Sequence, residues 1–530
     1  MKPKEGAMSI RSWTIVLAAA LAWMAAGGGA GPALAQKEPT TLLVLTRNQP
    51  RSLDPAKGSD NPTRKVFVGV YEPLIDHKPG TADIPNLEGV LAKAWKLSDD
   101  QQTYTFNLRE NVPFHDGSTL SADDVKVSLD RMRQIKLGHS WVLDPVKEIR
   151  VIDPMTVQVV LTRPYPPFLL GLPLLNIVSA KAVKAHEKDG DLAQAWFNIQ
   201  EAGTGPYRLS EFRVGQQIVL DRFEGYWRGW REKRIDRVVL KLVAESATQR
   251  IMMDGGQGDW ADTILPGDFR EMEKKKEFHA TKEPTWGIFW LMMNTNKAPL
   301  DNVKVRRALR YAYPYAPMLN DVMLGRGAAA RGYLPPGFYT HDDSPPEKMD
   351  LNMARQLLTE AGFPKGGFEL TLAYTNIWDF QRQSSEMFAA NLRQLGIELK
   401  IQGPPWATMM DLFTNASRRP HLAFYSADAD TADPDSTLYK TFHSKSTHWS
   451  NYGFGNPEVD GLLERARYET NREERVKLYK RVQGLLQELS PGINTLVATS
   501  NHLLRSNVKG YVFHPPYGYG AINYYSLWKE

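Results

Sequence analysis

The chain has 530 residues, no cysteine, and 65 basic against 60 acidic side chains, which gives a formal net charge of +5. The lack of cysteine excludes disulfide bonds, thiol catalysis and thiolate metal sites. The small positive charge is too weak to indicate a nucleic-acid-binding protein. The densest basic cluster, at residues 228–234, is mixed in sign and indicates a solvated surface. One hydrophobic core rarely serves more than about 250–300 residues, so two or three domains are expected.

The first 35 residues have the features of a secretion signal. Three basic residues precede an apolar run at residues 13–26, which is short for a membrane span. Small residues at Ala33 and Ala35 fit the rule for signal cleavage, so we expect export by the general secretion route and cleavage near Ala35. Residues 1–35 carry three positive charges and one negative, which leaves the mature chain at about +3.

The first half of the mature chain reads as mixed strands and helices. Tyr104, Phe106 and Leu108 alternate with polar residues, as in a half-buried strand. Ser121, with Asp124 three residues later, has the spacing of a capping box and predicts the start of a helix. Further strands are predicted at residues 41–45, 156–161, 217–220 and 238–242.

Residues 350–401 show a clearer pattern. Asp350 is placed to cap a helix that runs to Ala361, and Gly362 ends it. Alternating apolar residues at 368–374 and 397–401 predict two strands, and the helical spacing between them predicts a helix at 380–395. A strand, a helix and a strand joined by short loops form a parallel pair with a right-handed crossover.

The last part of the chain predicts two more helices and a tail. The helices begin at Asn456 and Asn471, and the aromatic tail at residues 507–530 returns to a strand-like pattern. Earlier, Pro314 must end the helix that begins at Val303. The alternation of helices and strands predicts an α/β protein whose tail folds back onto the first lobe.

Several segments together resemble one protein family. The segment YTFNLRENVPFHDGSTLSADDVKVSLDR at residues 104–131 and the GTGPY element at 203–207 are two of them. Others lie at residues 52–55, 70–74, 91–95, 294–296 with 303–310, and 456–460. In order and in coverage of the mature chain, they resemble the peptide/nickel-type solute-binding proteins, extracytoplasmic family 5, which serve ABC importers.

The resemblance implies an α/β fold of the two-lobed periplasmic-binding-protein kind (type II-like), with an extra subdomain inserted in the first lobe. The chain would divide into a signal peptide at 1–35, a discontinuous first lobe at 36–70, 200–290 and 500–530, the inserted subdomain at 71–199, and the second lobe at 291–499. Two crossings, near residues 289–296 and 496–502, would form the hinge. Ligand would lie between the lobes, and hinge motion would trap it.

An acidic segment at residues 425–435 is the best candidate for a ligand contact. In peptide-binding relatives, an aspartate in a D-x-x-D-P-like setting pairs with the peptide's α-ammonium, and Asp430, followed by Asp433 and Pro434, matches that position. The alternative for these acids is a helix cap or an Asx turn. A calcium loop is a weaker interpretation, because the glycine and terminal glutamate of an EF-hand are missing.

The same segment departs from the family. Relatives usually have a tryptophan near the position of Ala427, where this chain has Tyr425 and Asp428 as neighbouring candidates instead. The extra acid indicates a more cationic ligand or simply a different one.

Aromatic and main-chain contacts complete the predicted site. Trp406 aligns with an aromatic residue that lines the pocket in relatives, with ordinary core packing as the alternative. Asn48 and Gln49 follow the first strand, where an extended peptide could add through main-chain bonds. Tyr71 and Trp286 are further candidates, which core packing explains equally simply.

The residues indicate neither a metal site nor an enzyme. Single histidines such as His443 and His448 lack the spacing of metal ligands, and no cofactor is expected. The sequence contains no G-x-S-x-G elbow, no phosphate loop and no G-x-G-x-x-G turn. Paired carboxylates of a hydrolase would leave no sequence pattern, so a periplasmic hydrolase stays a minor alternative.

Taken together, these features predict a periplasmic, monomeric substrate-binding protein of an ABC transporter. It would capture a short peptide or a similar amino-containing solute and deliver it to the transmembrane subunits of the permease, with no nucleic-acid partner. A receptor for a sugar, an opine or a metal chelate in the same fold is the alternative.

Overall fold

The computed structural model describes residues 38–79, 86–376, 378–446, 450–514 and 520–530. Residues Thr40–Glu530 form one compact unit. The predicted secretion signal and its cleavage site near Ala35 lie outside the described residues. We call the seven-stranded sheet with its helices the first lobe, and the six-stranded sheet with its helices the second lobe.

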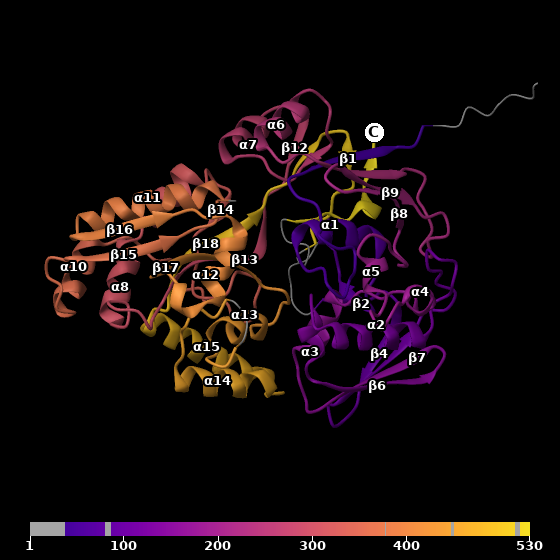
Figure 1. Ribbon diagram of the computed structural model, residues 1–530, viewed down its shortest axis with the longest axis horizontal. Helices are drawn as coiled ribbons and strands as arrows, with labels where there is room; N and C mark the ends of the chain where they lie inside the picture. The colour runs from indigo at the N-terminus through magenta and orange to yellow at the C-terminus, as the bar shows by residue number, and fades with distance from the viewer. Residues whose placement is uncertain (1–37, 80–85, 377, 447–449, 515–519) are drawn as a thin grey trace, which may run out of the picture. The chain divides into compact units, whose positions relative to one another are not determined.

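The first lobe is built on a mixed sheet in which β1 is central (Figure 1). This strand pairs in parallel with both β10 and β11, and its Leu42 and Val44 are fully buried. A strand covered on both faces needs such an apolar run. The strands predicted at 41–45, 217–220 and 238–242 are confirmed. In spatial order the sheet contains β12 (Phe278–Ala280), β19 (Leu503–Arg505), β11 (Trp260–Ala261), β1 (Thr41–Thr46), β10 (Arg237–Leu242), β9 (Gln217–Arg222) and β8 (Tyr207–Arg213).

A separate four-stranded antiparallel sheet lies within the first 165 residues. Its helix α2 (Ala122–Ile135) begins at the predicted capping box, where the Ser121 backbone N–H donates to Asp124 Oδ2 at 2.8 Å. The predicted strands at 104–108 and 156–161 are confirmed. The spatial order is β4 (Ala92–Leu97), β5 (Thr103–Leu108), β7 (Thr156–Leu161) and β6 (Val146–Asp153).

The second lobe has its own sheet and its own buried core. The predicted crossover is confirmed, because β15 and β16 pair in parallel on either side of α11 (Asp379–Arg393) in the chain. Figure 1 shows α11 packed along these two strands. In spatial order the sheet contains β14 (Gly327–Ala328), β18 (Gly492–Ser500), β13 (Glu283–Met293), β17 (Leu422–Asp428), β15 (Phe368–Ala373) and β16 (Ile397–Gln402).

The helices of the second lobe follow their predicted caps. Asp350 caps α10 (Leu351–Glu360), and Asn456 and Asn471 cap α14 (Pro457–Tyr468) and α15 (Arg472–Leu489). The helix α8 (Val303–Ala312) ends before Pro314, as predicted. Other elements of the described chain are β2 (Ile75–His77), β3 (Leu87–Gly89), α3 (Phe168–Gly171), α4 (Ala180–His186), α5 (Gln194–Phe197), α6 (Ser246–Asp254), α7 (Pro266–Met272), α9 (Tyr315–Pro317), α12 (Trp406–Thr414) and α13 (Asp435–Phe442).

The chain passes between the two large sheets twice. It leaves β12 for β13 at residues 281–282 and returns from β18 to β19 at residues 501–502. The two crossings touch, since the Thr281 backbone N–H donates to the His502 carbonyl at 2.9 Å. The second crossing lies where we expected it. The first precedes the expected residues 289–296, because β13 already belongs to the second sheet from Glu283 onward.

The C-terminal tail returns to the first lobe, as predicted, but mostly without strands. In its described part only β20 (Val508–Lys509) and β21 (Trp528–Lys529) pair, so the predicted strand-like pattern is largely wrong. The aromatic residues form packing contacts instead: Tyr524 is fully buried, and its ring centroid lies 6.3 Å from that of Tyr207. Lys529 Nζ also donates to Asp259 Oδ2 at 2.8 Å.

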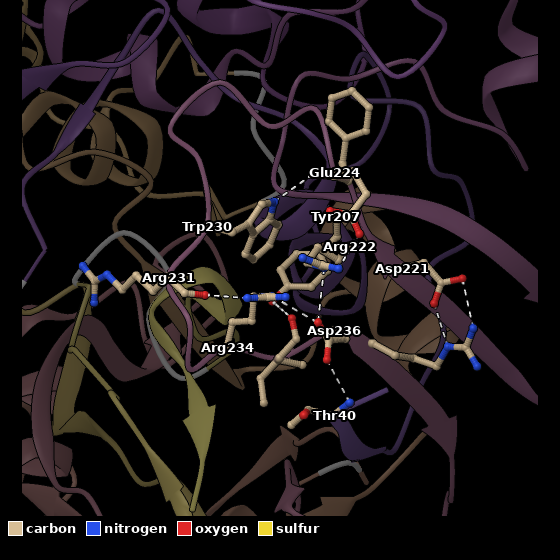
Figure 2. A network of polar contacts seen from close by, with 12 residues as sticks. Thr40, Tyr207, Asp221, Arg222, Glu224, Trp230, Arg231, Arg234 and Asp236 are labelled. Atoms are coloured by element: carbon tan, nitrogen blue, oxygen red, sulfur yellow. Dashed lines mark hydrogen bonds and ion pairs between the residues drawn. The ribbon is translucent and has the colours of Figure 1, made fainter. Parts of the chain in front are cut away.

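Figure 2 shows a polar network beside β9 and β10. Asp236 accepts hydrogen bonds from the Thr40 backbone N–H at 3.1 Å and from Arg234 Nε at 3.2 Å, and it lies 3.2 Å from Arg222 Nε. Arg234 also donates to the Arg231 carbonyl at 2.8 Å. Part of the basic cluster therefore pairs with groups of the chain itself.

Candidate functional site

A hollow that is open to solvent lies along one face of α1 (Asn61–Val70). The helix starts here because the Asp60 side chain accepts from the Thr63 backbone N–H at 2.9 Å and Pro62 occupies the first turn. The lining residues of α1 recur at helical spacing, so they share one face. The hollow is lined by Asp60, Thr63, Arg64, Phe67, Val68, Tyr71, Asp76, His139 and residues of the 173–176 loop, among others.

Charged groups from distant parts of the chain meet at His139. Burial, together with the positive charges of Arg64 and Lys440, lowers the pKa of His139 to about 4, against the opposing effect of Asp430. His139 is therefore neutral at pH 7. Asp430 and Lys440 of the second lobe therefore lie close enough to His139 to act on it electrostatically, and Asp430 also acts on Arg64, although neither Asp430 nor Lys440 is a lining residue of the hollow.

Asp430 is already engaged by a cation of its own lobe. It lies between β17 and α13, and Lys440 Nζ of α13 donates to Asp430 Oδ2 at 2.6 Å. Burial alone would raise the pKa of Asp430, but Lys440, His139 and Arg64 together lower it below its ordinary value. The carboxylate is therefore ionised at neutral pH. Its other oxygen accepts no hydrogen bond from the described residues.

The other acids of this segment are structural. Asp433 accepts two hydrogen bonds from the Arg475 guanidinium, at 2.6 and 2.8 Å, and one from the Asp435 backbone N–H at 2.9 Å. Asp435 accepts from Tyr165 Oη at 2.8 Å and lies 3.4 Å from Arg467 Nε. The Asx-turn interpretation therefore applies to Asp433, and its pairing with Arg475 anchors the segment that carries Asp430.

The aromatic candidates fall into two groups. Tyr71 lines the hollow, and its hydroxyl donates to the Leu53 carbonyl at 3.1 Å. Trp406 starts α12 and is 37% exposed. Tyr425 and Trp286 are core residues of the second lobe. The indole N–H of Trp286 is buried and has no hydrogen-bond partner among the described residues, and its ring packs edge-on against His77 at 5.4 Å.

The candidates after the first strand do not line the hollow. Gln49 Nε2 donates to the Arg213 carbonyl at 3.2 Å, and Gln49 Oε1 accepts from the Gly215 backbone N–H at 2.7 Å, so the β8–β9 turn uses both ends of its amide. Asn48 is exposed. Asp428 is the last residue of β17 and pairs there with Gly287 of β13.

Sequence reasoning missed Arg64, His139 and Lys440. The Asp60–Pro62 cap signature could have predicted α1, and helical spacing would then have put Arg64 on the face of Phe67 and Tyr71. No comparable signal exists for His139, because it follows α2 in a short loop and approaches Asp430 only in the folded chain.

Neither metal ligands nor a membrane helix appear in the described chain. No group of three or more potential ligand side chains was found there. His443 stacks on Tyr439 with ring centroids 4.3 Å apart, and its Nε2 lies 3.2 Å from Glu464 Oε1. His448 lies outside the described residues. Among the described helices, none is long and apolar enough to cross a bilayer.

Solved structures of similar architecture include periplasmic binding proteins. The dipeptide-binding protein of Pseudoalteromonas sp. SM9913, solved in complex with Met-Leu, superposes with a TM-score of 0.81 at 23% identity, covering 92% of this chain and 100% of that protein. The two-lobed α/β fold of periplasmic binding proteins is thus confirmed.

The family follows from the sequence. Residues 86–449 match the model of the bacterial extracellular solute-binding proteins, family 5. The chain is 29% identical to heme-binding protein A of Haemophilus influenzae, over 96% of this chain and 98% of that protein. It is 28% identical to the dipeptide-binding protein of Escherichia coli K12, over 90% and 92%. The chain belongs to family 5 of the extracellular solute-binding proteins, and its function is solute binding for an ABC transporter.

Proposed function

We propose that this protein captures a short peptide or a similar small amino-containing solute between its lobes and delivers it to the transmembrane subunits of an ABC permease. The observation that carries the proposal is the meeting of Asp430 and Lys440 of the second lobe with His139 and Arg64 beside the hollow. Relatives named for dipeptides and glutathione support the choice of ligand class. The site of action is the periplasm, where the protein works as a monomer.

The two crossings at residues 281–282 and 501–502 act as the hinge. A solute stabilises the closed form only through contacts that it makes better there than in the open form. The hollow beside α1, with Asp430 and Lys440 of the second lobe near its residues His139 and Arg64, can provide such contacts, and the permease then recognises the closed form. The solute leaves the site chemically unchanged.

Asp430 is the proposed partner of the solute's ammonium group. Its free oxygen can accept directly, or the ammonium can replace Lys440 at Oδ2. A charge-assisted hydrogen bond contributes about 1.5–3 kcal/mol, which corresponds to about 10- to 150-fold in affinity. The gain in affinity depends on how far the Lys440 ammonium moves away from the Asp430 carboxylate when the solute binds.

Native mass spectrometry of protein purified without refolding will show which solute the cleft retains. Titration calorimetry then compares the wild type with Asp430→Asn for that solute and for its N-acetylated form. We expect Asp430→Asn to weaken binding of the free amine about tenfold or more and to leave the acetylated form unaffected. Glu458→Gln, whose side chain is 57% exposed on α14, is the control.

If wild type and Asp430→Asn bind the free amine with equal affinity, the proposed contact between Asp430 and the ammonium group is refuted. Incubation with peptides or oligosaccharides, followed by mass analysis, checks that no product forms. A sugar, an opine or a metal chelate in the retained complex would shift the proposal to another ligand class.

A further inference from the structure

The hollow along α1 contains an arginine whose side chain is not bonded to any carboxylate of the described residues. Arg64 is half-buried, lines the hollow, and its guanidinium makes no hydrogen bond or ion pair with any described residue. Most buried or half-buried arginines of the described chain form hydrogen bonds or ion pairs with other protein groups. Arg131, for example, donates to Asp54 Oδ1 at 2.6 Å. Arg64 therefore differs from the structural arginines in having its five donors unused.

The nearest acids do not neutralise Arg64. Asp60 lies four residues earlier on the same helix, at a spacing where ion pairs form. Its carboxylate instead caps α1 through the Thr63 backbone N–H at 2.9 Å, and no ion pair joins it to Arg64. Asp430 approaches closely enough to interact with Arg64 electrostatically, but its hydrogen-bonded partner is Lys440.

Several charged groups of the described residues lie in or near the hollow, and none of them is bonded to the Arg64 guanidinium. Lys440 is bonded to Asp430 and Asp60 caps α1, while Asp76, which also lines the hollow, forms no ion pair with Arg64 among the described residues. His139 is neutral at pH 7. Closure of the lobes over a solute removes water from these groups, and an unpaired charge that loses its water is costly. A solute that brings a negative charge to Arg64 avoids this cost.

We infer that the solute carries an anionic group, a carboxylate or a similar oxyanion, and that Arg64 binds it. This inference rests on the proposed function and specifies the chemistry of the solute at that site. The planar guanidinium offers paired donors that match a carboxylate in two-point geometry, which a lysine at the same place cannot reproduce. Arg64 thus sets specificity from the α1 side, while Asp430 and Lys440 act from the second lobe.

The first test needs no variant. Affinities of the wild-type protein are measured by calorimetry for a panel of di- and tripeptides, each as the free acid and as the C-terminal amide, and for Ala-Glu against Ala-Gln. We expect loss of the bound carboxylate to weaken binding about 10- to 100-fold. Sensitivity to the amide identifies the terminal carboxylate as the bound group, and sensitivity to Glu-to-Gln exchange identifies the side-chain carboxylate.

The second test assigns the effect to Arg64. In Arg64→Gln the acid and its uncharged analogue should bind with nearly equal affinity, and Arg64→Lys should recover only part of the preference. Arg307→Gln, an exposed arginine of α8, should keep the wild-type preference. If Arg64→Gln does not fold, Arg64→Lys together with the wild-type comparison still decides the question.

The outcomes separate this inference from the proposed function. Equal wild-type affinity for acids and uncharged analogues overturns the anion site and leaves peptide binding intact. A preference that persists in Arg64→Gln overturns the role of Arg64. Failure of every peptide in the panel to bind overturns the proposed ligand class, and with it this inference.

Discussion

Replacing Arg475 with methionine tests how the acidic segment is held in place. The Arg475 and Asp433 side chains are 6% and 1% exposed and share two hydrogen bonds, at 2.6 and 2.8 Å. Methionine leaves the Asp433 carboxylate buried, with the Asp435 backbone N–H at 2.9 Å and Tyr339 Oη at 3.4 Å as its remaining donors. Removing one partner of such a buried pair costs about 3–5 kcal/mol in the free energy of unfolding.

Urea-induced unfolding followed by circular dichroism measures this cost. The control is Arg481→Met on the same helix, whose partner Glu458 lies 2.9 Å away at a pair that is 51% and 57% exposed. The control should cost less than about 1 kcal/mol. Asp433→Leu combined with Arg475→Met should be less destabilising than Arg475→Met alone, because no charge is left unpaired. If Arg475→Met costs no more than the control, the pair does not anchor this segment.

Two further predictions concern pH and packing. Burial, and then Lys65, lower the pKa of His502 to about 3, so the unfolded chain binds a proton below pH 6.5 that the folded chain rejects. His502 should therefore lower the free energy of unfolding by about 2 kcal/mol between pH 7 and pH 5. Urea unfolding at both pH values should show a smaller decrease for His502→Gln than for the wild type, and equal decreases would refute this prediction. A Cβ at Gly203 would lie 2.0 Å from the Val70 carbonyl oxygen, whereas one at Gly267 would meet nothing within 4 Å. We expect Gly203→Ala to lower the thermal midpoint markedly and Gly267→Ala to leave it nearly unchanged; equal midpoints would contradict the close approach.

Local pattern predicted much of the fold. The Ser121–Asp124 box, the Asp350 cap and the crossover at 368–401 appear as expected, because caps and apolar periodicity act over a few residues. The tail was mispredicted as strand-like, because its aromatic residues satisfy the same pattern by packing against the first lobe. The first crossing was misplaced because pairing with β18 extends β13 back to Glu283.

The site was less accessible to prediction. Asp430 was predicted as a ligand contact from the resemblance to relatives, and that prediction stays a proposal. Its pairing with Lys440 was not predicted. Asp433 and Asp430 look alike in the sequence, yet only one of them is anchored to Arg475.

The amino-acid sequence by itself determined the family, several of the helices and strands, and the absence of thiol chemistry, since these depend on residue identity and short-range spacing. Only the tertiary structure decided which charges are neutralised and which remain available. Charges pair according to distance in space, and Arg64, His139 and Asp430 come together only when the chain folds.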